Sequence, residues 1–419
     1  MRQLTVKLQR TPGDALTVGR LAEQDRRIYF EYDDAFVDTG IELSPFKLPA
    51  QPGLIEHADH AFGPLPGVFD DSLPDGWGLL LMDRHFRRQG IDPATLSPLD
   101  RLAYLGTRTM GALTYHPPSR EHPDHDETLI DLYDLGHNAE EVLEGDAAEV
   151  LPELMRAGGS PGGARPKVLV GIQGDRIISG EDDLPAGFLA SGGEHWIVKF
   201  TAREDARDAG PVEYAYALMA RAAGIHMPPT RLFEVKHGRS VRRYFGVQRF
   251  DRPRNADGNR RIHMHTFANL IHANFRIPST DYADLFKVTQ ALTRNHADLL
   301  RLFRLMVFNI AAHNRDDHAK NFAFTLDDQT GEWSLAPAYD LTHSPGPGGE
   351  HTTTILGEGR QPTRDHCLKL ATQFGLKPPQ TSPIIDQINT AITRWPSFAD
   401  QALCTKKIAT TIGKSVAPI

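Results

Sequence analysis

The sequence predicts an α+β fold with two lobes, one rich in strands and one rich in helices, preceded by a small N-terminal α/β subdomain. Two patterns predict this arrangement. Short runs of alternating apolar residues, typical of strands, occur early in the chain and return in residues 165–250. After residue 265, apolar residues recur at three- and four-residue steps, as on one buried helix face. A chain of 419 residues is expected to form two or three domains, with a cleft between the lobes.

The composition fits a soluble globular protein, with 40% hydrophobic and 24% charged residues. A net charge of -8 argues against a protein that holds DNA by itself, but contact with DNA through a basic partner stays open. Two cysteines exclude a disulfide framework. The N-terminus lacks the apolar core of a signal peptide, and no apolar run is long enough to cross a membrane. A cytoplasmic protein is therefore expected.

The N-terminal subdomain is predicted to span residues 1–116. Apolar residues alternate in 4–8 and again in 28–32, which indicates strands, and a helical pattern follows in 75–90. The next stretch, 117–128, is rich in proline, histidine and acidic residues, and we interpret it as a linker. A histidine metal site is the alternative, but no helix fixes the ligand spacing there.

The strand-rich lobe, or N-lobe, is predicted to span residues 129–250, and the helical C-lobe residues 251–419. In the N-lobe we expect one helix, 212–225, among four strands: 167–172, 195–200, 230–235 and 243–250. In the C-lobe we expect a buried helix over 299–310, which ends near Ala312, and a hairpin of the strands 322–326 and 333–340. Two helices, 364–375 and 382–394, are expected to close the chain.

A polar cluster, "HNRDDHAKNFAF" (313–324), follows the buried helix and precedes the hairpin. The two outer ends of an antiparallel hairpin lie side by side, so Asn321 and Asp340 should meet next to Asp316. One amide oxygen and two carboxylates suit Mg²⁺, which shares its remaining ligands with phosphate and water. His318 has no second histidine or cysteine at the spacing that zinc requires.

This arrangement predicts phosphoryl transfer, with Asp316 as the catalytic base and Asn321 and Asp340 as the metal ligands. Aspartate, asparagine five positions later and then a distant aspartate is the order found in protein kinases. The alternative is a polar turn with ordinary capping residues, since Asp and Asn are common in turns.

A lysine for the phosphates is expected on the strand 195–200. Alternation along this strand directs Trp196 and Val198 to one face and Lys199 to the other, towards the cleft. Glu213, at the start of the next helix, is the expected ion-pair partner of Lys199. Alternatively, the lysine lies on a solvent-facing strand edge and Glu213 only complements the helix dipole.

Two further stretches fit a nucleotide site. In "VQRFDR" (247–252), Gln248 and Phe250 stand where the lobes connect, a place where an adenine ring could bind the backbone and pack on the aromatic ring. A core strand would have the same pattern. The glycine-rich "GGSPGGARPK" (158–167) lacks the Gly-Lys pair of a Walker A motif, but such a loop can offer backbone N–H groups to phosphate. A flexible connection is the alternative.

Taken together, these residues resemble HipA, the serine/threonine kinase toxin of bacterial HipBA toxin–antitoxin modules. The resemblance covers nearly the whole chain, and its motifs occur in the same order: "SLPDGWGLLLMDR" (72–84), "SPGGARPK" (160–167), "WIVKF" (196–200), "VQRFDR" (247–252), "DDHAKNF" (316–322), "AYDL" (338–341) and "PTRDHCLKLA" (362–371).

The resemblance implies a kinase that uses ATP and Mg²⁺ and autophosphorylates on Ser160, the leading residue of the phosphate-binding loop. It implies a base at Asp316, metal ligands at Asn321 and Asp340, and a nucleotide site that includes Gly162, Gly163, Ala164, Lys167, Lys199, Glu213, Gln248 and Phe250. One departure is Asp317, where the best-known member has glycine. We expect Asp317 to add charge beside the base and to shift substrate preference.

The resemblance also implies a HipB-like helix-turn-helix antitoxin as partner, contact with DNA through that antitoxin, and a protein substrate such as an aminoacyl-tRNA synthetase. Two other functions stay open. One is a phosphotransferase that acts on a small molecule. The other is a non-toxic co-repressor subunit of a DNA-bound antitoxin complex.

Overall fold

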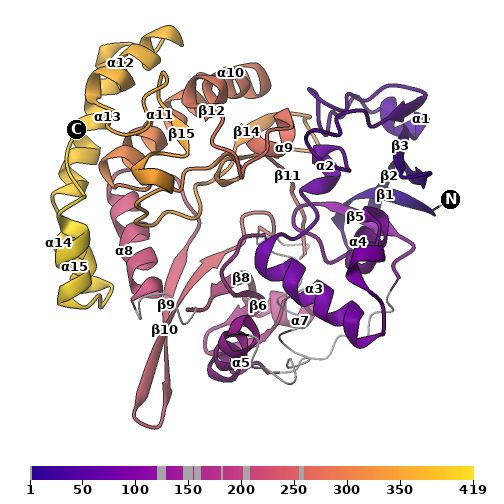
Figure 1. The fold of residues 1–419 in the computed structure, drawn as a ribbon, viewed down its shortest axis with the longest axis horizontal. Coiled ribbons are helices and arrows are strands. Elements are labelled where there is room, and N and C mark those ends of the chain that lie inside the picture. The colour runs from indigo at the N-terminus through magenta and orange to yellow at the C-terminus, as the bar shows by residue number, and fades with distance from the viewer. Residues whose placement is uncertain are drawn as a thin grey trace.

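The structure is a computed structural model with three parts: an N-terminal domain, a strand-rich N-lobe and a helical C-lobe (Figure 1). The N-terminal domain forms one side of the molecule, and the last helices of the C-lobe form the opposite side. The structure describes residues 2–119, 129–144, 154, 162–180, 183–201, 208–253 and 259–419. Ser160 and most of the predicted linker 117–128 lie outside these residues.

The N-terminal domain is built on an antiparallel five-stranded sheet in the order β4-β3-β2-β1-β5. The residues predicted to point inward, among them Val6 and Phe30, are buried, which confirms the alternation read from the sequence. The strands are β1 Arg2–Thr11, β2 Asp14–Gln24, β3 Arg27–Tyr32, β4 Leu54–Glu56 and β5 Leu113–His116. The helices are α1 Asp34–Val37, α2 Gly67–Asp70, α3 Gly76–Arg88 and α4 Pro98–Leu105, with a 3₁₀ turn η1 at Pro93–Thr95.

Helix α3 confirms the helix predicted in 75–90, but one of its faces packs outside its own domain. Trp77 and Leu81 belong to the core cluster of the N-lobe, together with Val168 and Val198. The Trp77 indole Nε1 donates a hydrogen bond of 3.0 Å to the carbonyl oxygen of Lys167. The N-terminal domain is therefore attached to the N-lobe at the start of its first strand.

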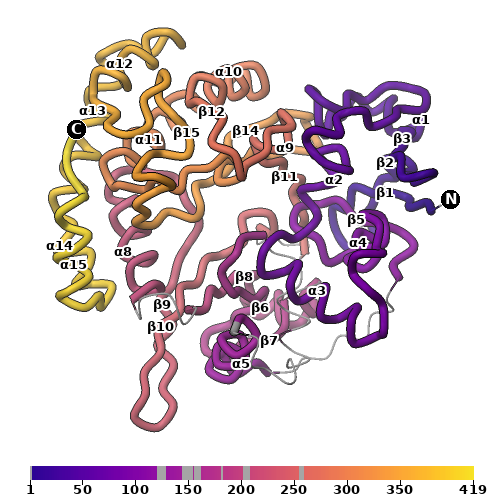
Figure 2. The backbone as a smooth tube through the Cα atoms, viewed as in Figure 1, coloured from indigo at the N-terminus to yellow at the C-terminus, as the bar shows by residue number. Residues whose placement is uncertain are grey.

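The N-lobe contains an antiparallel sheet in the order β7-β6-β8-β10-β9, and α8 packs against β9 and β10. The predicted strands are confirmed, while β7 was not expected. The elements are α5 Leu132–Glu144, β6 Lys167–Gln173, β7 Arg176–Ser179, α7 Ala186–Ala190, β8 Glu194–Lys199, α8 Ala209–Ala222, β9 Thr230–His237 and β10 Ser240–Gln248. The β9–β10 hairpin projects from the body of the molecule (Figure 2).

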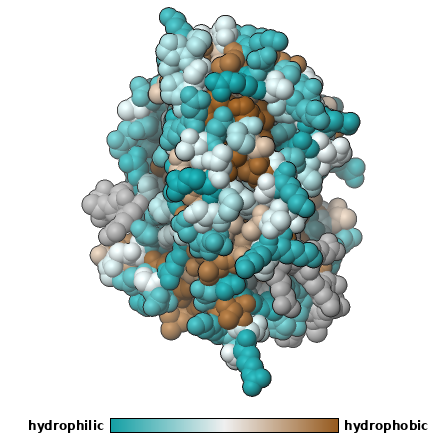
Figure 3. Space-filling model, turned by 90° about the vertical axis from the view of Figure 1, so that its left-hand side faces the viewer, coloured by the Kyte–Doolittle hydropathy of each residue, from teal (hydrophilic) through white to brown (hydrophobic). Residues whose placement is uncertain are grey.

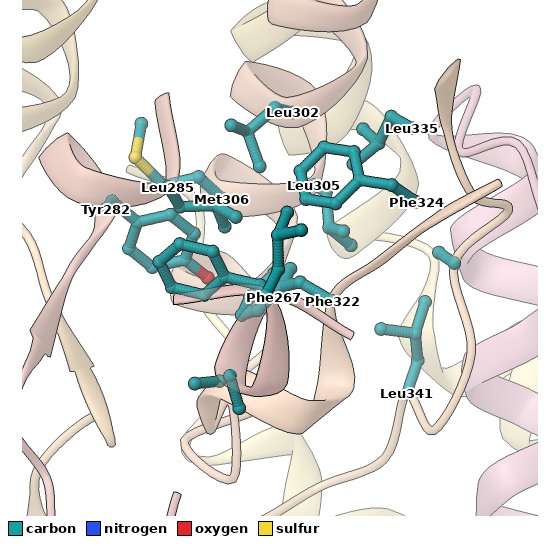
Figure 4. Close-up of a cluster of buried hydrophobic side chains, with 14 of the residues drawn as sticks. Phe267, Tyr282, Leu285, Leu302, Leu305, Met306, Phe322, Phe324, Leu335 and Leu341 are labelled. Atoms are coloured by element: carbon teal, nitrogen blue, oxygen red, sulfur yellow. The ribbon is translucent and has the colours of Figure 1, made fainter. Parts of the chain in front are cut away.

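The C-lobe is assembled around α11, whose apolar face was predicted from the sequence. Phe303 and Met306 on this helix are fully buried, and each such side chain stabilises the fold by about 1.5–3 kcal/mol. Figure 4 shows part of this core, with Met306 among the labelled side chains. The helices are α9 Phe267–Ile271, α10 Tyr282–Thr293, α11 His296–Ala311, α12 Arg364–Gln373, α13 Pro378–Ile392, α14 Trp395–Gln401 and α15 Lys406–Gly413.

A three-stranded sheet, β11-β13-β14, lies beside these helices and carries the predicted hairpin. Its strands are β11 His263–Thr266, β13 Ala323–Leu326 and β14 Trp333–Leu335. Two short parallel strands, β12 Thr280–Asp281 and β15 Thr353–Thr354, and two 3₁₀ turns, η2 Ala319–Asn321 and η3 Pro347–Gly349, complete the lobe.

Two expectations for the C-lobe are wrong. The strand predicted over 333–340 ends at Leu335, because the chain then leaves the sheet and the Ala338 N–H donates to His226 instead. Helices α12 and α13 do not close the chain, because α14 and α15 follow. The sequence did not predict α14, because Pro396 near its start resembles a helix breaker. In the structure Trp395 packs on Tyr216, with 5.4 Å between ring centres, and fixes the helix in place.

Figure 3 looks onto the face that carries the last helices and shows a mostly hydrophilic surface with scattered apolar patches. Within the residues that the structure describes, no helix is both long and apolar enough to span a membrane.

Candidate active site

The polar cluster forms a tight loop between α11 and β13. His313 adopts a left-handed conformation (φ +54°), which turns the chain sharply after the helix. Asn321 then closes the loop, because its Nδ2 donates a hydrogen bond of 2.7 Å to the carbonyl oxygen of Asp316. Asp316 itself is exposed. The loop therefore presents the candidate base to solvent and fixes the candidate metal ligand behind it.

Asn321 and Asp340 lie on segments that are tied together, although not by the regular hairpin that the sequence predicted. The hydroxyl of Tyr339, next to Asp340, donates a hydrogen bond of 2.6 Å to the carbonyl oxygen of Lys320, next to Asn321. Asp340 has a left-handed backbone (φ +58°), which turns its side chain towards the N-lobe. The two candidate ligands thus sit on adjoining stretches of backbone.

Lys199 connects the two lobes. Its ammonium donates to the carboxylate of Glu213 on α8 and to that of Asp340 in the C-lobe. Burial opposes the lysine charge, but Asp340 and Glu213 outweigh burial and raise the pKa of Lys199. Lys199 in turn holds the pKa of Asp340 well below its usual range. The predicted Lys199–Glu213 pair is therefore present and extends to the candidate metal ligand.

Lys167 stands directly opposite Lys199, on the neighbouring strand β6. Its ammonium is buried and donates a hydrogen bond of 2.6 Å to the carbonyl oxygen of Gly162. Burial and the charge of Lys199 lower the pKa of Lys167 to about 8. Two lysines side by side at the cleft favour a bound anion, which would relieve their mutual repulsion.

The described part of the glycine-rich loop rests on the start of α3. Gly163 (φ +95°) donates its N–H to the Asp75 carboxylate and accepts a hydrogen bond of 3.1 Å from the Trp77 N–H. A Cβ atom on Gly76 would lie 2.7 Å from the Cα of Ala164, so only glycine fits beside the loop. The N-terminal domain therefore helps to shape the candidate phosphate site, a role of Asp75 and Gly76 that the sequence pattern did not reveal.

The predicted nucleotide hinge lies at the end of β10. Gln248 is half-buried, and its N–H donates to the Pro229 carbonyl oxygen at 2.9 Å. The Phe250 ring stacks on Tyr339, the neighbour of Asp340, with 5.9 Å between ring centres. Phe250 thus faces the candidate metal site rather than a strand core.

The residues around the hinge fix it to the N-terminal domain. The buried Asp251 carboxylate pairs with Arg249 at 2.6 Å and accepts the Gly111 N–H at 2.8 Å. Burial opposes its ionisation, but Arg249 and Arg252 hold the pKa of Asp251 below its usual range. Arg252 also donates to the Thr109 carbonyl oxygen at 3.0 Å.

The environment of Asp316 suits a proton acceptor. Partial withdrawal from water raises the pKa of the Asp316 carboxyl. His318 opposes this shift, and the negative charges of Asp340 and Asp317 add to it. A carboxylate with a raised pKa takes up a proton more readily than an aspartate with an ordinary pKa does.

Asp317 has a different role from the one that the sequence suggested. It does add negative charge near Asp316, but its own carboxylate has no exposed surface and is bonded to His351 and Tyr282. Such a side chain cannot meet a protein substrate. The expectation that Asp317 shifts substrate preference is therefore replaced by a structural role.

The donor set fits Mg²⁺ held jointly with a nucleotide. Among the described residues, no group of three or more His, Cys, Asp or Glu side chains could hold a metal ion. Asn321 and Asp340 would supply two oxygen ligands, and Mg²⁺ commonly takes one or two from the protein and the rest from phosphate and water.

A two-lobed fold with a lysine–glutamate pair in one lobe and an Asp316–Asn321 loop in the other defines a protein-kinase-like protein. Family models match residues 13–116 to the HipA N-terminal domain and residues 159–395 to the HipA-like C-terminal domain. The chain therefore belongs to the HipA family.

Two known proteins resemble this chain over most of its length. A Sinorhizobium fredii protein named "Putative kinase Y4mE" is 30% identical over 367 residues, which cover 81% of this chain and 77% of that protein. A chain in the structure of the Shewanella oneidensis MR-1 HipA, HipB and operator DNA complex superposes with a TM-score of 0.68 at 18% identity. That superposition covers 98% of this chain and 94% of the other, and it supports the assignment of the fold.

Proposed function

We propose that this protein is an ATP- and Mg²⁺-dependent serine/threonine protein kinase and the toxin of a HipBA-type module. The observation that carries the proposal is Lys199, which pairs with Glu213 and reaches Asp340 across the lobes. In kinases, the corresponding lysine–glutamate pair holds the nucleotide phosphates beside the metal-binding aspartate. The family membership of the chain and the name of the S. fredii relative support the same activity.

In the proposed reaction, Lys199 and Lys167 bind the phosphates of ATP, and Gln248 and Phe250 border the adenine. The loop residues Gly162, Gly163 and Ala164 border the phosphates. Asn321 and Asp340 would hold a Mg²⁺ ion, which would supply positive charge to the phosphates.

Asp316 accepts the proton of the substrate hydroxyl as the hydroxyl oxygen attacks the γ-phosphorus. The bond between that phosphorus and the β–γ bridging oxygen breaks, and ADP leaves. The raised pKa of Asp316 favours this proton transfer.

We propose that the acceptor protein enters through a cleft of about 340 Å³ between the N-terminal domain and the C-lobe. Lys320 of the catalytic loop lines this cleft, as does Phe275, whose ring centre lies 5.4 Å from that of His318. The cleft therefore adjoins the loop that carries Asp316. An aminoacyl-tRNA synthetase is the substrate that the family resemblance suggests.

A HipB-like helix-turn-helix antitoxin is the proposed partner, with DNA contacted through it. The S. oneidensis structure contains HipA with HipB and operator DNA, which supports such a partner. The net charge of -8 suits a basic protein better than direct contact with DNA. The cytoplasm is the proposed location.

One experiment separates the proposed function from its alternatives. The chain is produced with and without a co-encoded small basic protein and is incubated with a cell lysate and γ-labelled ATP. A protein kinase labels proteins, and the Asp316→Asn variant does not. Label in small molecules alone would favour a small-molecule phosphotransferase, and no label at all would favour a co-repressor subunit. Mass spectrometry of the purified chain tests autophosphorylation on Ser160.

A further inference from the structure

The segment that follows Asp340 runs back alongside the catalytic loop. Asn314 forms a parallel bridge with Ser344, and the Arg315 N–H donates to the Ser344 carbonyl oxygen at 3.4 Å. Further on, the Thr352 N–H donates to the Arg315 carbonyl oxygen at 3.1 Å. We call residues 344–360 the return segment. In kinases, the stretch after the metal-binding aspartate is the activation loop, which must be ordered for activity.

Asp317 is the centre of the contact between the loop and the return segment. Its carboxylate accepts hydrogen bonds from the N–H groups of Thr352 at 2.9 Å and Thr353 at 3.3 Å. It also accepts from His351 Nδ1 at 2.9 Å and from the Tyr282 hydroxyl at 3.0 Å. Because a carboxylate can only accept, the proton on the His351 ring is at Nδ1. Four donors thus converge on one fully buried carboxylate.

The anchor continues into the core of the C-lobe. The Tyr282 hydroxyl accepts from Asn309 Nδ2 at 3.0 Å, and Asn309 Oδ1 accepts from Asn314 Nδ2 at 3.0 Å. The Tyr282 ring packs among the apolar side chains of Figure 4 and meets Phe322 edge-on at 5.6 Å. These hydrogen bonds connect Asp317 to α10 through Tyr282 and to α11 through Asn309. The catalytic loop is therefore fixed to two helices of the C-lobe.

The hydroxyl groups of the return segment are already in use. Thr352 Oγ1 donates to the Arg315 carbonyl oxygen at 3.0 Å, and Thr353 Oγ1 donates to the Asp317 carbonyl oxygen at 2.5 Å. Both threonines are buried. The Arg315 guanidinium donates to the carbonyl oxygens of Gly349 and Arg360. In other kinases, contacts between arginine and a phosphorylated residue order this stretch, whereas Arg315 binds backbone carbonyl oxygens here.

We propose that Asp317 is a positioning residue for phosphoryl transfer, which holds the catalytic loop and the return segment in working order without phosphorylation of that segment. The inference rests on the proposed function, because the position of Asp316 matters only if Asp316 takes the proton. Asp317 acts through its neighbour and touches no substrate. Its buried carboxylate does the ordering that a phosphate–arginine contact does elsewhere.

The test compares Asp317→Asn with Asp281→Asn. The Asp317→Asn amide keeps the shape but brings an NH₂ group against donors, so the anchor loosens. Asp281 holds the same segment at a different point, because its carboxylate accepts from Thr354 Oγ1 at 2.7 Å and from the Gly357 N–H at 2.8 Å. Among the described hydrogen bonds, none joins Asp281 to residues 314–317. Asparagine also caps helices as well as aspartate does, so α10 keeps its cap.

We expect kcat of Asp317→Asn to fall by about tenfold or more with KM for ATP within about twofold, since small displacements of a catalytic group cost rate rather than nucleotide binding. Amide exchange at Thr352 and Thr353 should become faster in this variant. Asp281→Asn should keep kcat near that of the parent. Tyr282→Phe removes one donor and keeps the ring, so kcat should fall by roughly 2–10-fold.

Three results would overturn the proposal. The first is a folded Asp317→Asn protein with parental kcat. The second is an equal loss of kcat in Asp281→Asn, which would mean that any loosening of the segment matters. The third is a kcat of Tyr282→Phe equal to that of the parent. This result decides the question if Asp317→Asn does not fold. A parent protein that transfers no phosphate overturns the proposed function itself, and the catalytic role of Asp317 with it. Amide exchange at Thr352 and Thr353 still reports on the anchor in that case.

Discussion

Lys199 and Asp340, 141 positions apart in the sequence, form an ion pair that joins the two lobes. Glu213 holds Lys199 from the other side, so one ammonium is shared between a helix of the N-lobe and a loop of the C-lobe. Among the ion pairs of the described residues, Lys199 is the only cation that contacts Asp340. Its ammonium lies at the point where the nucleotide phosphates are proposed to bind.

Changing Asp340 to alanine should weaken nucleotide binding in a Mg²⁺-dependent way, because one of the two proposed ligands is lost. The affinity for ATP should respond to added Mg²⁺ in the parent and respond weakly in Asp340→Ala. Asp284→Ala, which removes a half-buried aspartate on α10, serves as the control and should behave as the parent. Identical Mg²⁺ titrations for parent and Asp340→Ala would rule out this ligand.

The affinity for ATP should fall as the pH rises from 7 to 9. Burial and Lys199 lower the pKa of Lys167 to about 8, so the lysine is charged below this pH and neutral above it. ATP is an anion and binds the charged form better, so binding favours proton uptake and weakens as Lys167 loses its proton. Calorimetry across this pH range measures the effect. Lys167→Met should bind more weakly and with little dependence on pH, and a steep dependence in that variant would assign the effect to another group.

Replacing Gly76 with alanine should displace the glycine-rich loop and weaken nucleotide binding. The new Cβ would lie 2.7 Å from the Cα of Ala164, a contact that backbone cannot relieve cheaply. Gly90→Ala is a matched control, because Gly90 also has a positive φ (+75°) but has no atom within 4 Å of its Cβ position. Both variants should lose about 1 kcal/mol of stability from backbone strain. If ATP affinity falls equally in both, the contact with the loop is not the cause.

A charge reversal at the proposed acceptor cleft should impair phosphoryl transfer to other proteins and leave the affinity for ATP unchanged. Arg276 is exposed and lines the cleft. In Arg276→Glu, we expect severalfold less label on lysate proteins, with ATP affinity and self-labelling unchanged. Arg294→Glu, an exposed arginine at the end of α10, is the control. Normal labelling of lysate proteins by Arg276→Glu would place the acceptor elsewhere.

The sequence predicted the parts of the fold that depend on local pattern. The alternation in β1, β3 and β8 and the apolar face of α11 follow from packing of one side of each element, so these elements were found. The Lys199–Glu213 pair was also predicted, because a strand lysine and the following helix are close in the chain. Short elements with weak periodicity, such as β7 and α14, were missed.

The parts that were not predicted depend on contacts between distant segments. Asp75 and Gly163 are 88 positions apart in the sequence and form a hydrogen bond. No local sequence pattern in either stretch predicts this contact. Asp317 was expected to shift substrate preference, because a sequence pattern does not show that Tyr282 and His351 enclose its carboxylate. The expected strand 333–340 was too long, since its later residues bond to the loop at His226 instead of the sheet.

The most direct test of the kinase assignment is phosphoryl transfer by Asp316→Asn. The asparagine keeps the size of the side chain and the hydrogen bond from Asn321 to the backbone of this residue, so the fold and the affinity for ATP should be retained. An amide cannot accept the proton of the attacking hydroxyl, so transfer of the γ-phosphate to protein should fall by roughly 10²-fold or more. Transfer at a rate near that of the parent, in a folded protein that binds ATP normally, would contradict the assignment of Asp316 as the catalytic base.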